Sequence, residues 1–335
     1  MGWLIRDVTA QEFVSYFGEP GRDPLARFVL APVPFPRQFV FAYREGESKP
    51  TARICGSQSV GKDLAIGFFS GDPDAFVPMN RHLEAWALRQ GATRLIGPMI
   101  YNTWFPYRAR LFDEEQSRIG AEGFQGFSWE PNQNRGDERL WEDAGYQAIE
   151  KYSSRGYSDL QGFYQRLKPA LDAALADGFT IHTFPSLMVD EASRSRLLDD
   201  LFQLTMQSFK DAFLFQPIPR EYFHQLYLAG FSELKDLSSS FLMRDREGRA
   251  AAFSFGFPDR GYMVFKTLAV GTDYRGKKLS NAVMAASAEV GVRQGLDKMI
   301  HALMRRGNLS EHFGGRSELL FEHSYGLFAK QLDSK

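Results

Sequence analysis

Lys266-Thr-Leu-Ala-Val-Gly-Thr-Asp-Tyr-Arg-Gly-Lys-Lys-Leu-Ser-Asn281 is the stretch from which the rest of this chain can be interpreted. Thr267 to Val270 predicts an apolar strand, Gly271 to Lys278 a turn-forming loop, and the residues from Leu279 or Ser280 onward a helix. A loop that holds a glycine and three cations just before a helix start directs backbone N–H groups and a positive helix end at one point. The stretch therefore predicts a phosphate-binding site.

Length and charge limit the classes of protein to which the chain can belong. Its 335 residues are enough for two domains, each with its own core. The formal net charge is -1 and the pI is near 6.6, so no broad positive field attracts nucleic acid or an acidic membrane surface. We expect neither as a partner, and any anion site must be local.

Cysteine content and hydropathy suggest a compartment. Cys55 is the only cysteine, which excludes an intramolecular disulfide and a cysteine-based metal cage and suits a reducing compartment. Asp7 and Glu12 interrupt the N-terminal region, so no secretory signal is visible. No apolar run approaches the roughly 20 residues needed to cross a bilayer. We therefore expect a cytoplasmic protein.

The chain repeats one order of predicted elements: strand, helix, strand meander, helix, strand, loop and strand. This repetition predicts a first domain over residues 1–155, a connecting helix over 156–178 and a second domain over 179–335. The first-half counterpart of the opening loop is Ser70-Gly-Asp-Pro-Asp74, whose two aspartates would repel phosphate. We therefore expect the anion site in the second half.

A P-loop is one interpretation of the opening stretch, because Gly271 to Lys277 fits G-x4-G-K. The next position of that motif is a Ser or Thr that ligates magnesium, but here it is Lys278. The following strand, Met299 to Met304, leads into Arg305-Arg306 instead of the aspartate that holds the metal in nucleotide hydrolases. The sequence thus disfavours a nucleotide hydrolase.

The run Thr267 to Ser280 resembles the acyl-CoA pyrophosphate loop of the GNAT acetyltransferase superfamily. Asn308-Leu-Ser310 and the closing Ser324-Tyr-Gly-Leu-Phe-Ala-Lys330 are also similar to that family, and Ala65 to Phe69 with Gly91 to Pro98 resemble it more weakly. The resemblance implies an α/β (α+β) chain of two GNAT-like domains, each a mixed, mostly antiparallel sheet flanked by helices. The first domain would be a degenerate copy, and the second would bind acyl-CoA.

Two departures from the family pattern concern the site. The family loop usually begins with Gln or Arg and ends with Gly or Ala, where this chain has Asp273 and Lys278. A lysine side chain at the last position would alter how CoA sits, or would hold phosphate through its ammonium. The family's frequent catalytic tyrosine is also missing, and the turn Glu311-His-Phe313 stands in its place.

The resemblance implies direct transfer of an acetyl or other acyl group from acyl-CoA to an amine of a small molecule or peptide. Acyl-CoA would be a co-substrate, no metal would take part, and a homodimer is compatible with this scheme. Backbone N–H groups of the strand end would stabilise the thioester oxygen. The implied cofactor-binding residues are Leu268, Ala269, Val270, Arg275, Gly276, Lys277, Lys278, Leu279, Ser280, Asn308 and Ser310.

Each of these assignments has a simpler alternative. Arg275, Lys277 and Lys278 could form a solvated basic turn, and Asn308 could only cap a short helix. His312 is the predicted acid for the leaving thiolate by position, although an exposed histidine on a turn needs no function.

Tyr325 is the second predicted catalytic residue, from the last strand, where a half-buried tyrosine is also ordinary. Glu311 is a conceivable base or a surface carboxylate, and His301 is expected in the core. The spacing of the histidines matches no known metal site.

Two other functions fit parts of the sequence. The missing tyrosine suits a non-catalytic protein that binds acyl-CoA or an acyl carrier. A Fem-type transferase that uses aminoacyl-tRNA shares the tandem layout, but near-neutral charge disfavours an RNA ligand. The aromatic region Phe202 to Phe231 would wall the acceptor pocket in the family, or simply pack a core.

Overall fold

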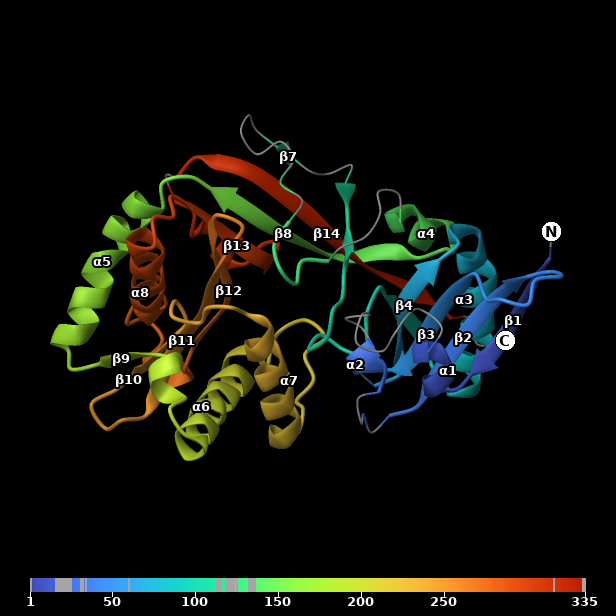
Figure 1. Cartoon of the computed structure of the whole chain (residues 1–335), viewed down its shortest axis with the longest axis horizontal. Coiled ribbons are helices and arrows are strands. Elements are labelled where there is room, and N and C mark those ends of the chain that lie inside the picture. The colour runs from blue at the N-terminus through green and yellow to red at the C-terminus, as the bar shows by residue number, and fades with distance from the viewer. Residues whose placement is uncertain are drawn as a thin grey trace. The chain divides into compact units, whose positions relative to one another are not determined.

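A computed structural model describes residues 2–15, 26–30, 33, 35–59, 61–112, 116–117, 124, 126–131, 137–315 and 317–332 (Figure 1). The chain forms two compact units. Unit 1 holds residues 1–114, 131–151 and 324–335, and unit 2 holds residues 115–130 and 152–323. Two strands, β8 (Gln147–Tyr157) and β14 (Leu319–Gln331), therefore contribute residues to both units.

Unit 1 is built on a sheet with the strand order β1-β2-β3-β4-β5-β14. Neighbouring strands are antiparallel except β4 and β5, which are parallel. The longest helix of this unit, α3, buries Phe76, Met79 and Leu83 completely, as their helical spacing predicts. The elements are β1 (Trp3–Val8), α1 (Ala10–Ser15), α2 (Ala26–Val29), β2 (Arg37–Arg44), β3 (Ala52–Gln58), β4 (Asp63–Gly71), α3 (Phe76–Arg89), β5 (Arg94–Gly97), β6 (Ala109–Arg110) and α4 (Asp137–Asp143).

Unit 2 has the strand order β8-β13-β12-β11-β10-β9, again with one parallel pair, β12 and β13. Helix α8 carries buried alanines at 282, 285, 286 and 288, and these small side chains let α5 pack closely beside it (Figure 1). The elements are β7 (Gln116–Ser117), α5 (Leu160–Ala176), β9 (Thr180–Thr183), α6 (Glu191–Phe209), α7 (Arg220–Glu233), β10 (Phe241–Arg244), β11 (Ala250–Asp259), β12 (Tyr262–Val270), α8 (Leu279–Arg293) and β13 (Lys298–Arg305).

The two units differ from the predicted division at 1–155, 156–178 and 179–335. The predicted connecting helix is α5, and it belongs to unit 2 because Leu160 and Phe163 share a core cluster with Met284 of α8. The last part of β14 belongs to unit 1, because Phe328 to Gln331 pair with β5. No helix in the described part of the chain is long and apolar enough to span a membrane.

Candidate acyl-CoA site

Strands β12 and β13 part halfway along their length. They pair in parallel only where Tyr262 to Phe265 face Lys298 to His301. Beyond this point β12 stays paired with β11 as far as Val270, whereas the end of β13 pairs with β8. The parting leaves one edge of β12, from Thr267 to Val270, outside the ladder with β13, and its backbone groups can bind a ligand there.

Irregular backbone marks the point where the strands part. Phe255 of β11 pairs with Thr267 and Gly256 with Phe265, so Lys266 is an extra residue in β12. Such a bulge bends its strand and redirects its backbone groups. On the other side, β13 shifts register between His301 and Met304, and Leu303 has a φ of 54°. Both strands therefore bend at the same level.

The loop that follows β12 has the backbone that an anion site requires. A short 3₁₀ helix, η4 (Thr272–Tyr274), leads to Gly276 with a φ of 82°. Lys278 then caps α8 in the left-handed region, with a φ of 56° and no side-chain bond to the helix. Among the described residues, no acceptor is found for the N–H groups at 276 and 278–280. These groups and the positive end of the α8 macrodipole are therefore available to bind phosphate.

The three cations of the loop are exposed, and none pairs with a carboxylate of the described residues. The Lys277 ammonium lies 5.6 Å from the centre of the Phe179 ring and 5.9 Å from that of Tyr274. This cation–π contact directs Lys277 back toward the protein. Arg275 and Lys278 are therefore the better placed of the three to contact a phosphate.

Tyr274 anchors the loop to the turn between β10 and β11. Its hydroxyl donates to Asp245 over 2.5 Å, and the Arg249 guanidinium donates to the same carboxylate over 2.7 Å. Burial raises the pKa of Asp245, but these hydrogen bonds outweigh burial and hold it well below its ordinary value. Burial and the bond to Asp245 raise the pKa of Tyr274 to about 12. The neutral phenol and the carboxylate thus fix the loop at neutral pH.

The turn after β13 contains most of the remaining predicted residues. Asn308 begins a 3₁₀ helix, η5 (Leu309–His312), without a side-chain hydrogen bond to it, so the alternative role as a side-chain cap is not observed. Asn308 and His312 are exposed, and Ser310 is half-buried. Glu311 accepts from Arg155 at 3.1 Å and from the Gly307 N–H at 2.7 Å. This carboxylate therefore holds the turn together instead of standing alone at the surface.

Tyr325 lies outside this arrangement. It belongs to the part of β14 in unit 1, where it pairs with Arg110 and has no exposed surface. The predicted loop, strand end and turn all belong to unit 2. The structure therefore brings the predicted cofactor-binding residues and His312 into one unit, whereas Tyr325 is buried in the other.

His301, predicted as a core histidine, is buried at the level where β12 and β13 part. Its ring is 5.2 Å from Phe265 and 5.4 Å from Phe163, and its Nε2 has no hydrogen-bond partner within the described part of the chain. Burial lowers the pKa of His301 to about 3. The imidazole is therefore neutral at physiological pH and cannot serve as a cation. The described residues contain no cluster of three metal-binding side chains, and the absence of a metal from the reaction stays a prediction.

Because the buried His301 has a lowered pKa, we expect unit 2 to be less stable at acidic pH. The unfolded chain takes up the proton near pH 6.5, whereas the folded protein does so only near pH 3, so protonation favours unfolding between these values. From pH 7.5 to pH 5 this group alone should remove about 2 kcal/mol. Urea unfolding at both pH values should show a smaller loss for His301→Leu than for the wild type. His312→Leu, at an exposed position, should leave the loss unchanged.

Unit 1 closes the equivalent opening with its own residues. Its parallel strands β4 and β5 also pair over only three residues, but the Met99 N–H then donates to the Ile66 carbonyl at 2.8 Å. Ahead of α3, Asp72 accepts from the Asp74 N–H at 3.0 Å. Backbone thus fills the gap between the strands, and a carboxylate caps the short 3₁₀ turn just before α3. That the first domain is a degenerate copy stays a prediction.

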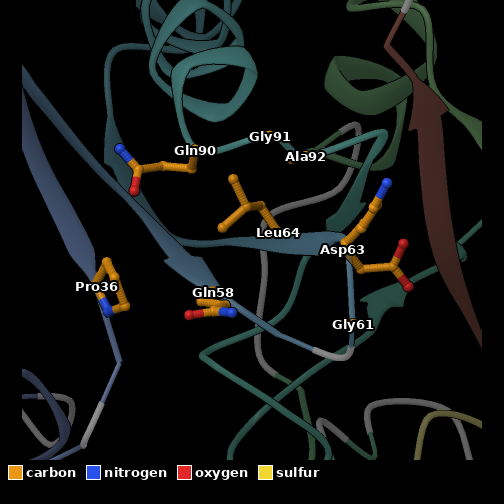
Figure 2. A pocket seen from close by; sticks show the side chains of 9 residues that line it. Pro36, Gln58, Gly61, Asp63, Leu64, Gln90, Gly91 and Ala92 are labelled. Carbon is orange, nitrogen blue, oxygen red and sulfur yellow. The ribbon is translucent and has the colours of Figure 1, made fainter.

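A shallow pocket of unit 1 lies at the other end of α3 (Figure 2). Gln90, Gly91 and Ala92 line it from the end of the helix, and Asp63 and Leu64 line it from the start of β4. The C-terminal end of a helix carries a partial negative charge, which disfavours phosphate. This pocket is therefore not a second version of the unit 2 site.

Comparison with known proteins identifies the fold. No protein-family model matches the chain, and no curated protein matches its sequence. Among solved structures, a tandem GNAT protein from the clavulanic acid biosynthesis pathway matches with a TM-score of 0.54 at 12% identity, over 100% of both chains. The chain has the tandem GNAT fold.

Two further structures support this assignment. A GCN5-related N-acetyltransferase from Sphaerobacter thermophilus matches with a TM-score of 0.51 at 13% identity, over 99% of this chain and 96% of its own. A probable N-acyltransferase from Enterococcus faecalis V583 matches with a TM-score of 0.54 at 8% identity, over 99% of this chain and 73% of its own. The predicted tandem GNAT arrangement, with a mixed sheet flanked by helices, is confirmed.

Two residues that shape the candidate site were not predicted from the sequence. Lys266 was not predicted as a bulge, because a bulge depends on the partner strand and β11 lies outside the motif. Asp245 was not predicted as the anchor of the loop either, because its contact with Tyr274 depends on how the β10–β11 turn packs. The only local signal was the turn Asp245-Arg-Glu-Gly248, which predicts a hairpin and says nothing of Tyr274.

Proposed function

We propose that this protein is an acyltransferase whose unit 2 moves an acetyl or other acyl group from acyl-CoA to an amine. One observation carries the proposal: the edge of β12 that parts from β13 leads directly to the start of α8, whose N–H groups and nearby cations have no acceptor or carboxylate partner among the described residues. An elongated ligand with phosphate at one end and a polar chain at the other fits both features. Acyl-CoA has this chemistry.

The residues present fit acyl-CoA in named positions. The N–H groups at 276 and 278–280, with Arg275 and Lys278, would hold the phosphates. The edge from Thr267 to Val270 would pair with the amides of the pantetheine arm, and the bulge before it would turn this edge toward the thioester carbonyl oxygen. When bound, acyl-CoA supplies an activated acyl carbon and a thiolate leaving group.

Helices α6 and α7 supply candidates for the acceptor site. Phe184 and Phe231 pack on Phe255 of β11, one residue pair from the bulge. Ser208, near the end of α6, donates to the Val270 carbonyl at 3.0 Å and so ties this helix to the parted strand. Packing accounts for Phe223 and Phe231, which are buried, while the half-buried rings from Phe209 to Phe215 would face an apolar part of the acceptor. The acceptor class we propose is a small molecule or peptide with a primary amine.

Acetyl-CoA binding tests the site. At roughly 100 times its dissociation constant, acetyl-CoA should raise the free energy of unfolding by about 2.7 kcal/mol. Titration calorimetry should give one site per chain, because unit 1 closes the equivalent opening. Absence of binding would show that the loop has been misinterpreted, and two sites would contradict our account of unit 1.

Thiol release tests transfer. Acetyl-CoA should release free thiol in the presence of a primary alkylamine, an amino sugar or a peptide with a free N-terminus, and the acylated product should appear by mass spectrometry in equal amount. Tight binding without thiol release for any amine would instead support the non-catalytic acyl-CoA binding protein that the missing tyrosine suggests.

A further inference from the structure

One side chain ties the loop of residues 271–278 to the rest of unit 2. Among the described residues, the Tyr274 hydroxyl makes the only side-chain hydrogen bond between this loop and another part of the chain, to Asp245 over 2.5 Å. The main chain adds a bond from the Gly271 N–H to the Ala251 carbonyl at 2.9 Å, but only at the start of the loop. Tyr274 is therefore the hydrogen-bonded tether of the middle of the loop.

Asp245 does more than form the turn between β10 and β11. Its side chain is only 7% exposed, and its Oδ1 accepts the N–H groups of Glu247 at 3.0 Å and of Arg249 at 2.8 Å. These two bonds shape the turn and leave Oδ2 to accept from the Arg249 guanidinium and the Tyr274 hydroxyl. A residue that only formed the turn would need a single side-chain oxygen. The second oxygen therefore serves the contact with the loop.

Arg249 supplies the positive charge that this carboxylate needs. Its guanidinium donates to Oδ2 of Asp245 at 2.7 Å, although 69% of the arginine side chain is exposed. Burying a carboxylate is costly without a charged partner, and this pair keeps Asp245 ionised in its buried position. An ionised acceptor binds a hydroxyl more strongly than a neutral one does. Tyr274, Asp245 and Arg249 thus form one hydrogen-bonded chain, which we call the clasp.

The backbone that follows the clasp is strained. Lys278, the cap of α8, has a φ of 56°. A residue with a side chain is disfavoured in this left-handed region, and such strain persists only where the surrounding structure enforces it. Helix α8 fixes one end of the loop, and the clasp fixes Tyr274 near its middle. Without the clasp, the loop would have other conformations open to it.

We propose that the clasp pre-organises this loop for the phosphates of acyl-CoA, and that Tyr274, Asp245 and Arg249 are positioning residues for this ligand. The inference rests on the proposed function. Arg275 and Gly276 directly follow Tyr274 in the chain, so the clasp determines where the Arg275 cation and the Gly276 N–H lie. If only a fraction of the molecules holds the loop in its binding conformation, the apparent dissociation constant rises by the inverse of that fraction.

The clasp acts on one end of the ligand only. In the proposed complex the loop binds the phosphates, whereas the edge of β12 that parts from β13 binds the pantetheine arm and the thioester. Weakening the clasp should therefore affect acetyl-CoA and free CoA alike. It should leave S-acetylpantetheine, a thioester without these phosphates, unaffected. A general loss of structure in unit 2 would instead impair the use of both thioesters.

The test compares Tyr274→Phe and Asp245→Asn with the control Tyr262→Phe, which removes a hydroxyl at the end of β12 opposite to the loop. Tyr274→Phe keeps the ring packed 6.1 Å from Phe179 and removes only the bond to Asp245. For each clasp variant, titration calorimetry should give a Kd for acetyl-CoA about tenfold higher than that of the wild type. The double variant should lose no more, because both residues act through one bond. The control should bind with the wild-type Kd.

Kinetics and amide exchange separate positioning from a structural role. In Tyr274→Phe, KM for acetyl-CoA should rise while kcat at saturation and kcat/KM for S-acetylpantetheine stay unchanged. The Lys277 amide, bonded to the Tyr274 carbonyl at 3.3 Å, should exchange faster in this variant until acetyl-CoA saturates it. An unchanged Kd, or an equal loss with S-acetylpantetheine, would overturn the inference and leave the transferase intact. A wild type that does not bind acetyl-CoA would overturn the proposed function as well. If circular dichroism shows that Asp245→Asn fails to fold, Tyr274→Phe decides.

Discussion

Removing residues 324–335 should unfold unit 1. These residues supply the last strand of its sheet, and Tyr325, Leu327 and Phe328 are 0%, 0% and 2% exposed. Without them β5 loses the partner to which Phe328 to Gln331 bind, and Trp141 loses the ring that stacks on it at 6.5 Å. A domain is stable by only about 5–15 kcal/mol, and deletion of one large buried side chain costs about 3–5 kcal/mol, so the loss of three, together with the hydrogen bonds of the strand, is as large as the whole reserve.

Tryptophan fluorescence provides the measurement. Four of the five tryptophans, at 3, 86, 104 and 141, belong to unit 1, so emission in urea reports mainly on that unit. The truncated chain should show unfolded-like emission without urea, and Phe328→Ala alone should lower the unfolding free energy of unit 1 by about 3–5 kcal/mol. Leu88→Ala, at a side chain 44% exposed, should change it by less than about 0.5 kcal/mol. A native-like truncated protein would show that unit 1 does not depend on β14.

The same strand shows where sequence reasoning reaches its limit. The pattern predicted a closing strand over Glu318 to Ala329, and β14 spans Leu319–Gln331. The strands that pair with β14 could not be predicted, because alternation along a strand does not determine which neighbouring strands it pairs with. Assigning it to the second half placed Tyr325 near the acyl-CoA loop, whereas its pairing places it in unit 1.

Local features were predictable because local chemistry determines them. Val270 ends β12 and Leu279 begins α8, as the glycine-containing loop between them indicated. Gly276 has the positive φ that a turn glycine supports. By contrast, the pairing of Glu130 with His323 joins residues from opposite halves of the chain, and nothing near either residue marks it. The loop and the helix start could thus be predicted from one stretch, but the pairing of Glu130 with His323 depends on tertiary contacts.

Reversing the charge of Arg275 should abolish acyl-CoA binding. Arg275 lies between Tyr274, which is anchored to Asp245, and Gly276, whose N–H has no acceptor among the described residues. A charge-assisted hydrogen bond to phosphate contributes about 1.5–3 kcal/mol, and a carboxylate at this position adds repulsion. For Arg275→Glu we therefore expect a Kd for acetyl-CoA at least roughly 100-fold higher, because each 1.4 kcal/mol is a factor of ten.

Arg293→Glu is the matched control for this prediction. Arg293 is exposed in the last turn of α8, so the variant has the same net charge as Arg275→Glu but carries its change at the opposite end of the same helix. If long-range charge alone attracted the ligand, both variants would weaken binding alike, and both effects would fade with salt. A local phosphate site predicts a large loss for Arg275→Glu and little change for Arg293→Glu at 0.15 M salt. Equal losses would mean that the loop does not contact the ligand, and the phosphate site would then have to lie elsewhere in unit 2.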